Sequence, residues 1–370
     1  MKTLSRTCRI QTAGAIIAGA ALFLATAHAG HAQFTSTVFA SGVAVSGAQP
    51  DSITLGGGHV FVEYGNGADS SAPLGTDGSS TIAEYDTSGN ALATFSALGS
   101  VDGLRYNPAT NLLWVLQNQD GNSALETIDP TSGLTTKYTY STSISGPSGR
   151  GFDDVTFVGG KAFLSYTNPA NLGDAVIYSA TLGSGMVSLG SPVLSYDGPS
   201  STTLNDPDSL DQTPNGSLLL TSGDDGALTT ISSPGTLEQK VSSVSLTDSV
   251  TGNNVKGLDD TVFAPSAGSS LLVADTKNNA IYKVTGPFQP GGAYSSIGST
   301  NTLDSLDLST GIATAISSGL FPANASPHGL GFLPAAAVPE ASTTVSFGLL
   351  LTLGLGGVIL ARRKSAVSAA

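Results

Sequence analysis

The sequence contains the pattern Pro50-Asp51-Ser52-Ile53, in which proline or an apolar residue precedes an acid, a small or polar residue and an aliphatic residue. Four further copies keep the acid, and a sixth has histidine in its place: Val101-Asp102-Gly103-Leu104, Phe152-Asp153-Asp154-Val155, Pro207-Asp208-Ser209-Leu210, Leu258-Asp259-Asp260-Thr261-Val262 and Pro327-His328-Gly329-Leu330. The copies start 51, 51, 55, 51 and 69 residues apart. Such a period is typical of repeat proteins whose unit is one supersecondary element.

Each of the first five copies is followed by a turn and a second apolar strand. These strands are predicted at 59–64, 112–116, 162–166, 217–221 and 270–274. Later turns, which contain glycine, join a third strand to a fourth at 86–89, 129–133, 183–185, 233–235 and 308–311. Four strands in each unit of this length are typical of a β-propeller blade.

Six copies of the pattern predict an all-β propeller of six blades, with five or seven as alternatives. The alternatives stay open because the last interval is longer than the others. We interpret it as holding an insertion around 287–299. The sixth blade has its inner strand at 328–333, and we expect residues 35–45 to supply its outer strand and to close the ring. One domain would then cover residues 33–336.

The clearest blade combines Leu271-Leu272-Val273-Ala274-Asp275 with Asn278-Asn279-Ala280-Ile281-Tyr282-Lys283. This sequence pattern resembles that of the NHL and gluconolactonase-like propellers, and the resemblance covers roughly residues 50–335. The resemblance implies the propeller fold. The Glu, Asn and Asp metal ligands of gluconolactonase-like enzymes have no residue-by-residue counterpart in this sequence.

The first strand of a propeller blade lines the central channel, so the acids of the pattern are expected to meet near one mouth. The predicted ring consists of Asp51, Asp102, Asp153, Asp208, Asp259 and His328. Clustered carboxylates repel one another unless a cation or protons intervene, and oxygen ligands suit Ca²⁺ or Mg²⁺. The alternative is that each acid bonds backbone N–H groups of the neighbouring blade and so holds the ring together.

The N-terminus is typical of a secretory signal peptide covering residues 1–32. Lys2, Arg6 and Arg9 precede an apolar stretch at 13–26, and small residues at 27–32 offer cleavage sites after Ala29 or Ala32. The mature chain would lose Cys8, its sole cysteine, which excludes disulfides, thiolate metal sites and cysteine nucleophiles.

The C-terminus carries Val338-Pro339-Glu340-Ala341-Ser342, an apolar segment at 343–361 and the basic cluster Arg362-Arg363-Lys364. An apolar run of about 17–20 residues can span a bilayer, and the basic cluster stays cytoplasmic. Residues 337–365 resemble the PEP-CTERM sorting signal, also known as the ice-binding protein C-terminal domain, with Ala341 in place of a second proline. The resemblance implies a transient inner-membrane anchor, removed by an exosortase-type protease, and a final place at the cell surface or outside the cell. An ordinary membrane anchor without cleavage is the alternative.

Without the two terminal segments the chain keeps 8 basic and 26 acidic side chains, a net charge of −18. A surface so acidic repels nucleic acid, which excludes it as a partner. The sequence also lacks the Gly-x-Ser-x-Gly, Walker and His-Glu-x-x-His motifs. We therefore expect an exported binding protein, with exopolysaccharide or another envelope component as partner. A metal-dependent hydrolase or lactonase using the acidic ring and a scaffold without ligand are the two alternatives.

Overall fold

The computed structural model describes residues 33–72, 76, 78–118, 123–141, 151–316 and 319–335. The predicted signal peptide at 1–32, the sorting segment at 337–365 and its apolar span at 343–361 lie outside these residues. In the described ranges, no helix is long and apolar enough to cross a membrane. The described residues from Phe34 to 335 form one compact unit.

The described chain is all-β, with one short 3-10 helix, η1, at Gly42–Val45. The first sheet holds β2 (Pro50–Gly56), β3 (His59–Tyr64), β4 (Ser79–Tyr85) and β5 (Ala91–Leu98). The next is an eight-stranded sheet made of two sets of four: β6 (Val101–Asn107), β7 (Leu112–Gln117), β8 (Ala124–Ile128) and β9 (Thr135–Tyr140), then β10 (Phe152–Val158), β11 (Lys161–Tyr166), β12 (Ala175–Leu182) and β13 (Met186–Ser195). The two sets join where the outer strands β13 and β9 pair in parallel.

Three sheets complete the unit. One holds β14 (Pro207–Gln212), β15 (Leu218–Ser222), β16 (Ala227–Ser232) and β17 (Lys240–Ser245). The next, called the fifth-repeat sheet, holds β19 (Leu258–Phe263), β22 (Ala293–Ile297), β23 (Thr302–Asp307), β24 (Ile312–Ala315) and the two-residue β18 (Thr247–Asp248). The last, called the closing sheet, holds β25 (Pro327–Leu333), β20 (Ser270–Asp275), β21 (Ala280–Thr285) and β1 (Thr35–Ser41).

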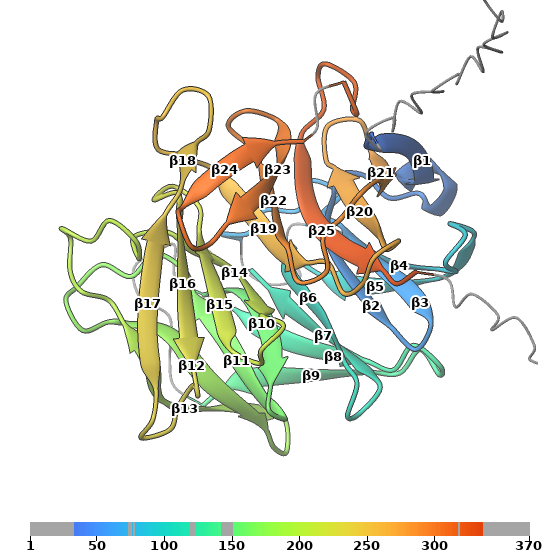
Figure 1. The fold of residues 1–370 in the computed structure, drawn as a ribbon. Helices are drawn as coiled ribbons and strands as arrows, with labels where there is room; N and C mark the ends of the chain where they lie inside the picture. Colours follow the sequence, from blue (N-terminus) through green and yellow to red (C-terminus); the bar gives the residue numbers. More distant parts are fainter. Residues whose placement is uncertain are drawn as a thin grey trace, which may run out of the picture. The chain divides into compact units, whose positions relative to one another are not determined.

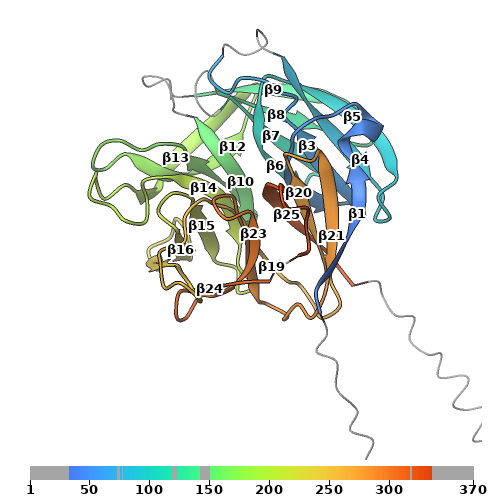
Figure 2. The same cartoon turned by 90° about the horizontal axis from the view of Figure 1, so that it is seen from above.

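The first strands of these sets contact one another in cyclic order: β2, β6, β10, β14, β19, β25 and again β2. This is a β-propeller-like arrangement, whose sheets are seen in Figure 1. Figure 2 shows β6, β10 and β25 near the middle of the molecule and β5, β13 and β1 at its periphery. The predicted inner position of the repeated pattern is therefore confirmed.

The closing sheet combines the two ends of the described chain. β1 pairs with β21 from Thr35↔Thr285 to Ser41↔Ala280, while β25 pairs with β20 from Ser270↔Leu333 to Asp275↔Pro327. The prediction that residues 35–45 supply an outer strand is confirmed for 35–41, and 42–45 form η1. Because the sheet needs both ends, early and late segments must meet before it can form.

The interpretation of the last interval is wrong in two respects. Strand β20 pairs with β25 and not with β19, although it follows β19 in the chain. The supposed insertion around 287–299 contains β22, which is the strand that pairs with β19. After β19 the chain thus enters the closing sheet, where it forms β20 and β21. It then returns to the fifth-repeat sheet for β22 to β24 and ends in the closing sheet as β25. Sequence proximity favours pairing of successive strands without requiring it.

The second strands of the sets, such as β3 and β7, are buried on both faces because each sheet packs between two neighbours. In β3, Val60, Val62 and Tyr64 belong to the cluster shared with the closing sheet, while Phe61 packs toward β6 and β7. Trp114 on β7 is 5% exposed and makes an edge-on contact with Phe157. Trp114 is therefore part of the core, and packing on both sides holds the inner strands around the channel.

Candidate functional site

A β-bulge lies at the same place in all six inner strands. In the first, Pro50 pairs with Tyr64 and Ile53 with Val62, so Asp51 and Ser52 lie opposite Glu63 alone. The other five inner strands show the same shift at their copy of the pattern. A bulge re-aims the side chains of its two residues. Consecutive residues of the pattern can therefore have different tasks.

The structure brings the five predicted aspartates to one cavity of about 20 Å³. It is lined by Asp51, Asp102, Asp153, Asp208 and Asp259, together with Ser52, Asp154, Ser209, Asp260 and Gly329. That volume has room for about one water molecule or one ion. Ring symmetry and the bulge thus place five carboxylates around a space too small to separate them with bulk water.

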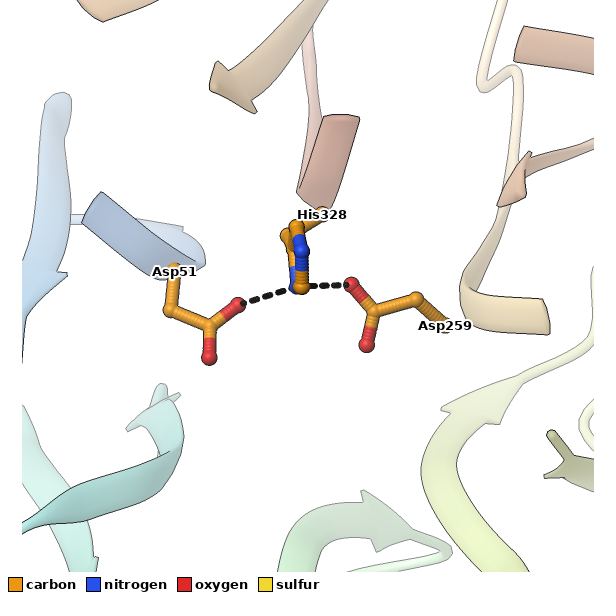
Figure 3. A group of neighbouring side chains, drawn as sticks. All are labelled: Asp51, Asp259 and His328. Atoms are coloured by element: carbon orange, nitrogen blue, oxygen red, sulfur yellow. Dashed lines mark ion pairs between the residues drawn. The ribbon is translucent and has the colours of Figure 1, made fainter. Parts of the chain in front are cut away.

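His328 joins two members of the ring. Its Nδ1 lies 3.5 Å from Oδ1 of Asp51 and 3.1 Å from Oδ2 of Asp259, as Figure 3 shows. Burial alone would lower the pKa of His328, but hydrogen bonds to Asp259 and Asp51 and the charges of both raise that pKa to about 11. At neutral pH the imidazole is therefore a cation that neutralises one part of the ring.

The opposite part of the ring has a different electrostatic environment. Burial, followed by the charge of Asp153, raises the pKa of Asp102 well above its ordinary value. Burial and the charge of Asp259 do the same to the pKa of Asp208. Within the described ranges, neither Asp102 nor Asp208 forms an ion pair with a basic side chain. These carboxyls need protons or an added cation.

In four of the five copies that have an acid, the residue after the ring acid forms a side-chain hydrogen bond to the neighbouring inner strand. Asp154 accepts a hydrogen bond from Leu210 N at 2.9 Å, and Asp260 accepts one from Leu330 N at 2.8 Å. The hydroxyls of Ser52 and Ser209 donate to the carbonyls of Asp102 and Asp259, respectively. The alternative role considered for the ring acids is therefore performed by the next residue in the pattern.

Glycine occupies this second position in the remaining two copies because the next strand comes too close. A Cβ at Gly103 would lie 2.5 Å from the carbonyl oxygen of Asp153, and one at Gly329 would lie 1.9 Å from that of Asp51. Every junction between inner strands thus has either a side-chain hydrogen bond or a backbone approach that only glycine permits.

Arg105, which sequence reasoning missed, ties three inner strands together. Its Nε donates to Val155 O at 3.0 Å, and its Nη2 donates to Asp154 Oδ2 at 2.9 Å and to Leu210 O at 2.6 Å. Its Nη1 also lies 3.8 Å from Asp211 Oδ1. Burial raises the pKa of Asp211 to about 6 against the opposing charge of Arg105. The position of Arg105, a basic residue three positions after Asp102 in the same inner strand, was the available signal.

Glu63 is a second residue that the sequence reasoning missed. It is fully buried on β3, directly behind the bulge at Asp51. Burial, followed by the charge of Asp51, raises the pKa of Glu63 well above its ordinary value. Burial thus favours the protonated form of this side chain next to the ring. A single acid within the apolar run 60–64 could have indicated it.

Comparison with known proteins gives structural likeness only. No family model matches the chain, and no curated protein matches it. A Pseudomonas aeruginosa periplasmic gluconolactonase is 12% identical, with 78% of this chain and 89% of that chain covered and a TM-score of 0.46. Virginiamycin B lyase from Staphylococcus aureus is 13% identical, with 82% of this chain and 96% of that chain covered and a TM-score of 0.45. A Lactobacillus plantarum protein is 14% identical, with 77% of this chain and 88% of that chain covered and a TM-score of 0.47.

Proposed function

We propose that residues 34–335 form a closed six-bladed propeller that holds one divalent cation at its channel mouth, and that the chain is an exported binding protein. The observation that carries the cation site is the convergence of five carboxylates on a cavity of about 20 Å³. Carboxylates at such spacing ionise together only when a cation compensates them. Binding a cation would oppose the effect of burial, which raises the pKa of both Asp102 and Asp208.

The side chains favour Ca²⁺ or Mg²⁺ and one position within the ring. Both ions prefer oxygen ligands, and the ring supplies only carboxylates apart from His328. The imidazolium of His328 repels a cation, and its single positive charge already offsets one of the two negative charges of Asp51 and Asp259. We therefore place the ion next to Asp102 and Asp208, whose carboxyls lack a basic partner among the described residues.

Metal content and thermal stability test this site. The purified protein should retain about one Ca²⁺ or Mg²⁺ after dialysis, melt at a lower temperature with EDTA and recover with Ca²⁺, because ligand binding to the native state stabilises it. Asp208→Asn should abolish the response. Asp224→Asn, an exposed acid in the β15–β16 turn, is the matched control and should keep it. A melting temperature indifferent to both EDTA and Ca²⁺ would favour the scaffold without ligand.

A second candidate is a metal-dependent hydrolase or lactonase. It is favoured by the His328 side chain, which remains about one-third exposed while it binds two carboxylates. A charged N–H at a cation site can donate a proton to a leaving group. Lactone hydrolysis by the Ca²⁺-loaded or Mg²⁺-loaded protein, lost in His328→Gln at unchanged metal content, would support this activity. A loaded protein without turnover would contradict it.

We also propose that the two terminal segments direct the chain to the cell surface or the surrounding matrix. The support is the order of sequence features: a signal peptide at 1–32, the Pro339-Glu340 motif, an apolar span and a basic cluster. The proposed partners are an exosortase-type protease during sorting and an exopolysaccharide or envelope component afterwards. The acidic body disfavours nucleic acid as a partner.

A further inference from the structure

A second pocket lies where the closing sheet meets the first sheet, at the ends of the inner strands that are farthest from the ring acids. Its volume is about 670 Å³, which is within the range of small-molecule sites. Leu55 and Gly56 line it at the end of β2, and Leu333 lines it at the end of β25. The ring acid Asp51 lies near the start of β2, so the length of an inner strand separates the two sites.

The lining of this pocket differs in charge from the rest of the body. Acids outnumber bases in the body, yet none of the described residues that line the pocket is acidic. Two basic side chains line it, Lys283 on β21 and His59 at the start of β3. His59 Nδ1 lies 2.5 Å from Glu84 Oε1, so Glu84 offsets the charge of His59 whenever the imidazole is protonated. Lys283 therefore gives the pocket its net positive charge.

The strand register directs Lys283 toward the first sheet. Lys283 pairs with Leu272 on β20 and with Thr37 on β1. Ile281, two residues earlier and on the same face of β21, packs in the cluster between the closing sheet and the first sheet. The side chain of Lys283 is half-buried and forms no ion pair or hydrogen bond with any residue that the structure describes. Its ammonium group is therefore available to a ligand in the pocket.

The uncharged part of the lining combines hydroxyls with apolar surface. The hydroxyls of Ser270 and Thr87 form no hydrogen bond with the described part of the chain, so each can donate to a ligand and accept from it. Leu55, Leu333 and Pro334 supply the apolar surface. The pocket thus offers one cation, two hydroxyls and an apolar wall.

We infer that this pocket binds a uronate, a pyranose sugar that carries a carboxylate. The carboxylate pairs with the ammonium group of Lys283 in a charge-assisted hydrogen bond. The sugar hydroxyls exchange hydrogen bonds with Ser270 and Thr87, and the C–H surface of the sugar ring covers Leu333. A neutral sugar leaves the lysine unpaired, and an aliphatic carboxylate leaves the two hydroxyls unpaired.

The acidic body opposes this ligand only weakly. Charges more than about 8 Å apart are largely screened at physiological ionic strength, so the lysine within the pocket acts on the ligand more strongly than distant acids do. A uronate carries one charge per sugar, whereas a nucleic acid duplex carries one charge in about 1.7 Å. The charge that excludes nucleic acid therefore permits a uronate.

The inference rests on the proposed binding role and names its ligand class, an acidic sugar of an exopolysaccharide, but it uses a site separate from the ring. The two proposals fail separately. Asp208→Asn should remove the Ca²⁺ response and leave uronate binding unchanged, whereas Lys283→Gln should do the reverse.

Saturation-transfer NMR on the full chain tests the inference, with glucuronate, galacturonate and glucose titrated separately. The buffer is free of divalent cations, so that no ion can link a uronate to the ring. At least one uronate should bind about tenfold more tightly than glucose, because only the uronate pairs with the lysine. Lys283→Gln should remove that difference, and added salt should reduce it.

Two further variants complete the test. Lys277→Gln is the matched control, because it removes an equal charge from the exposed turn between β20 and β21, and it should bind uronate as the wild type does. Thr87→Glu places a carboxylate at an exposed position of the lining, where it should repel the uronate and weaken its binding. This variant decides the question if Lys283→Gln does not fold.

Three results would overturn the inference. The first is that neither uronate binds the wild type, or that glucose binds equally well, and the second of these would leave a general role in sugar binding. The second is uronate binding that is unchanged in both Lys283→Gln and Thr87→Glu, which would place the sugar elsewhere. The third is that hexanoate binds in a Lys283-dependent way while no uronate does, which would make the pocket a site for apolar carboxylates.

Discussion

The carboxylate of Asp154 on β10 accepts a hydrogen bond from the backbone N–H of Leu210 on β14, at 2.9 Å. The same oxygen, Oδ2, also binds Nη2 of Arg105, at 2.9 Å. One buried carboxyl thus joins three successive inner strands, while Asp153, one residue earlier, lines the channel cavity.

Asp154→Ala should destabilise the protein strongly. It leaves Leu210 N without an acceptor and Arg105 without its nearest counter-ion, and an uncompensated buried charge costs roughly 3–5 kcal/mol. Asp260→Ala, which leaves only Leu330 N unpaired, should cost about 1–3 kcal/mol. Urea denaturation measures both. Equal losses in the free energy of unfolding for the two variants would mean that the ion pair with Arg105 adds little to the stability that Asp154 confers.

Gly329→Ala should prevent normal packing of the closing sheet. Its Cβ would lie 1.9 Å from Asp51 O, a backbone atom that cannot move aside alone. We expect a loss of about 3 kcal/mol or more in the free energy of unfolding. Gly183→Ala, whose Cβ would meet nothing nearer than 3.9 Å, should be almost neutral in the same measurement. A well-folded Gly329→Ala would contradict the close approach of the two inner strands.

The affinity for Ca²⁺ should rise in His328→Gln. The pKa of His328, at about 11, keeps the imidazole charged at neutral pH, so the substitution removes a positive charge near the proposed ion. Calorimetric titration at low salt measures the change, and Asp102→Asn should lower the affinity under the same conditions. A fall in affinity on losing His328 would instead make Asp51, Asp259 and His328 the ligand set.

The stability conferred at Asp304 should depend on pH in a defined direction. Burial raises the pKa of Asp304 to about 6, so the folded state binds this proton more tightly than the unfolded state does. The contribution of Asp304 to the free energy of unfolding is complete below about pH 4 and is lost as the pH rises through about 6. Asparagine does not titrate in this range. From pH 4.5 to pH 8, the free energy of unfolding of Asp304→Asn should therefore rise by on the order of 2 kcal/mol relative to that of the wild type. Urea midpoints of both proteins at the two pH values check this, and a constant difference would contradict it.

The mature protein should begin near Gly30 or Gln33 and lack the segment after about Pro339. Intact-mass measurement on protein from the native host checks both ends. A mass that includes residues 343–370 would leave an ordinary anchor in place of the sorting signal.

The sequence by itself determined the positions of the inner strands, the residues of the ring and the use of residues 35–41 in the closing sheet. These follow from local pattern and period, because each copy of Pro50-Asp51-Ser52-Ile53 must begin a strand of the same kind. It could not determine which inner strand β20 joins. Strands β19 and β25 both begin with a copy of the pattern, and the choice between them depends on packing between distant parts of the chain.

Tertiary structure also decided the division of tasks within the pattern. Two adjacent acids, Asp153 and Asp154, look equivalent in sequence and both line the cavity, but the bulge also brings the carboxylate of Asp154 to the N–H of Leu210 on the next strand. Likewise, the ring closes β25 onto β2 and so brings His328 to Asp51, 277 positions earlier. Period and composition specify which side chains recur. Contacts between strands that are far apart in the chain specify what each side chain meets.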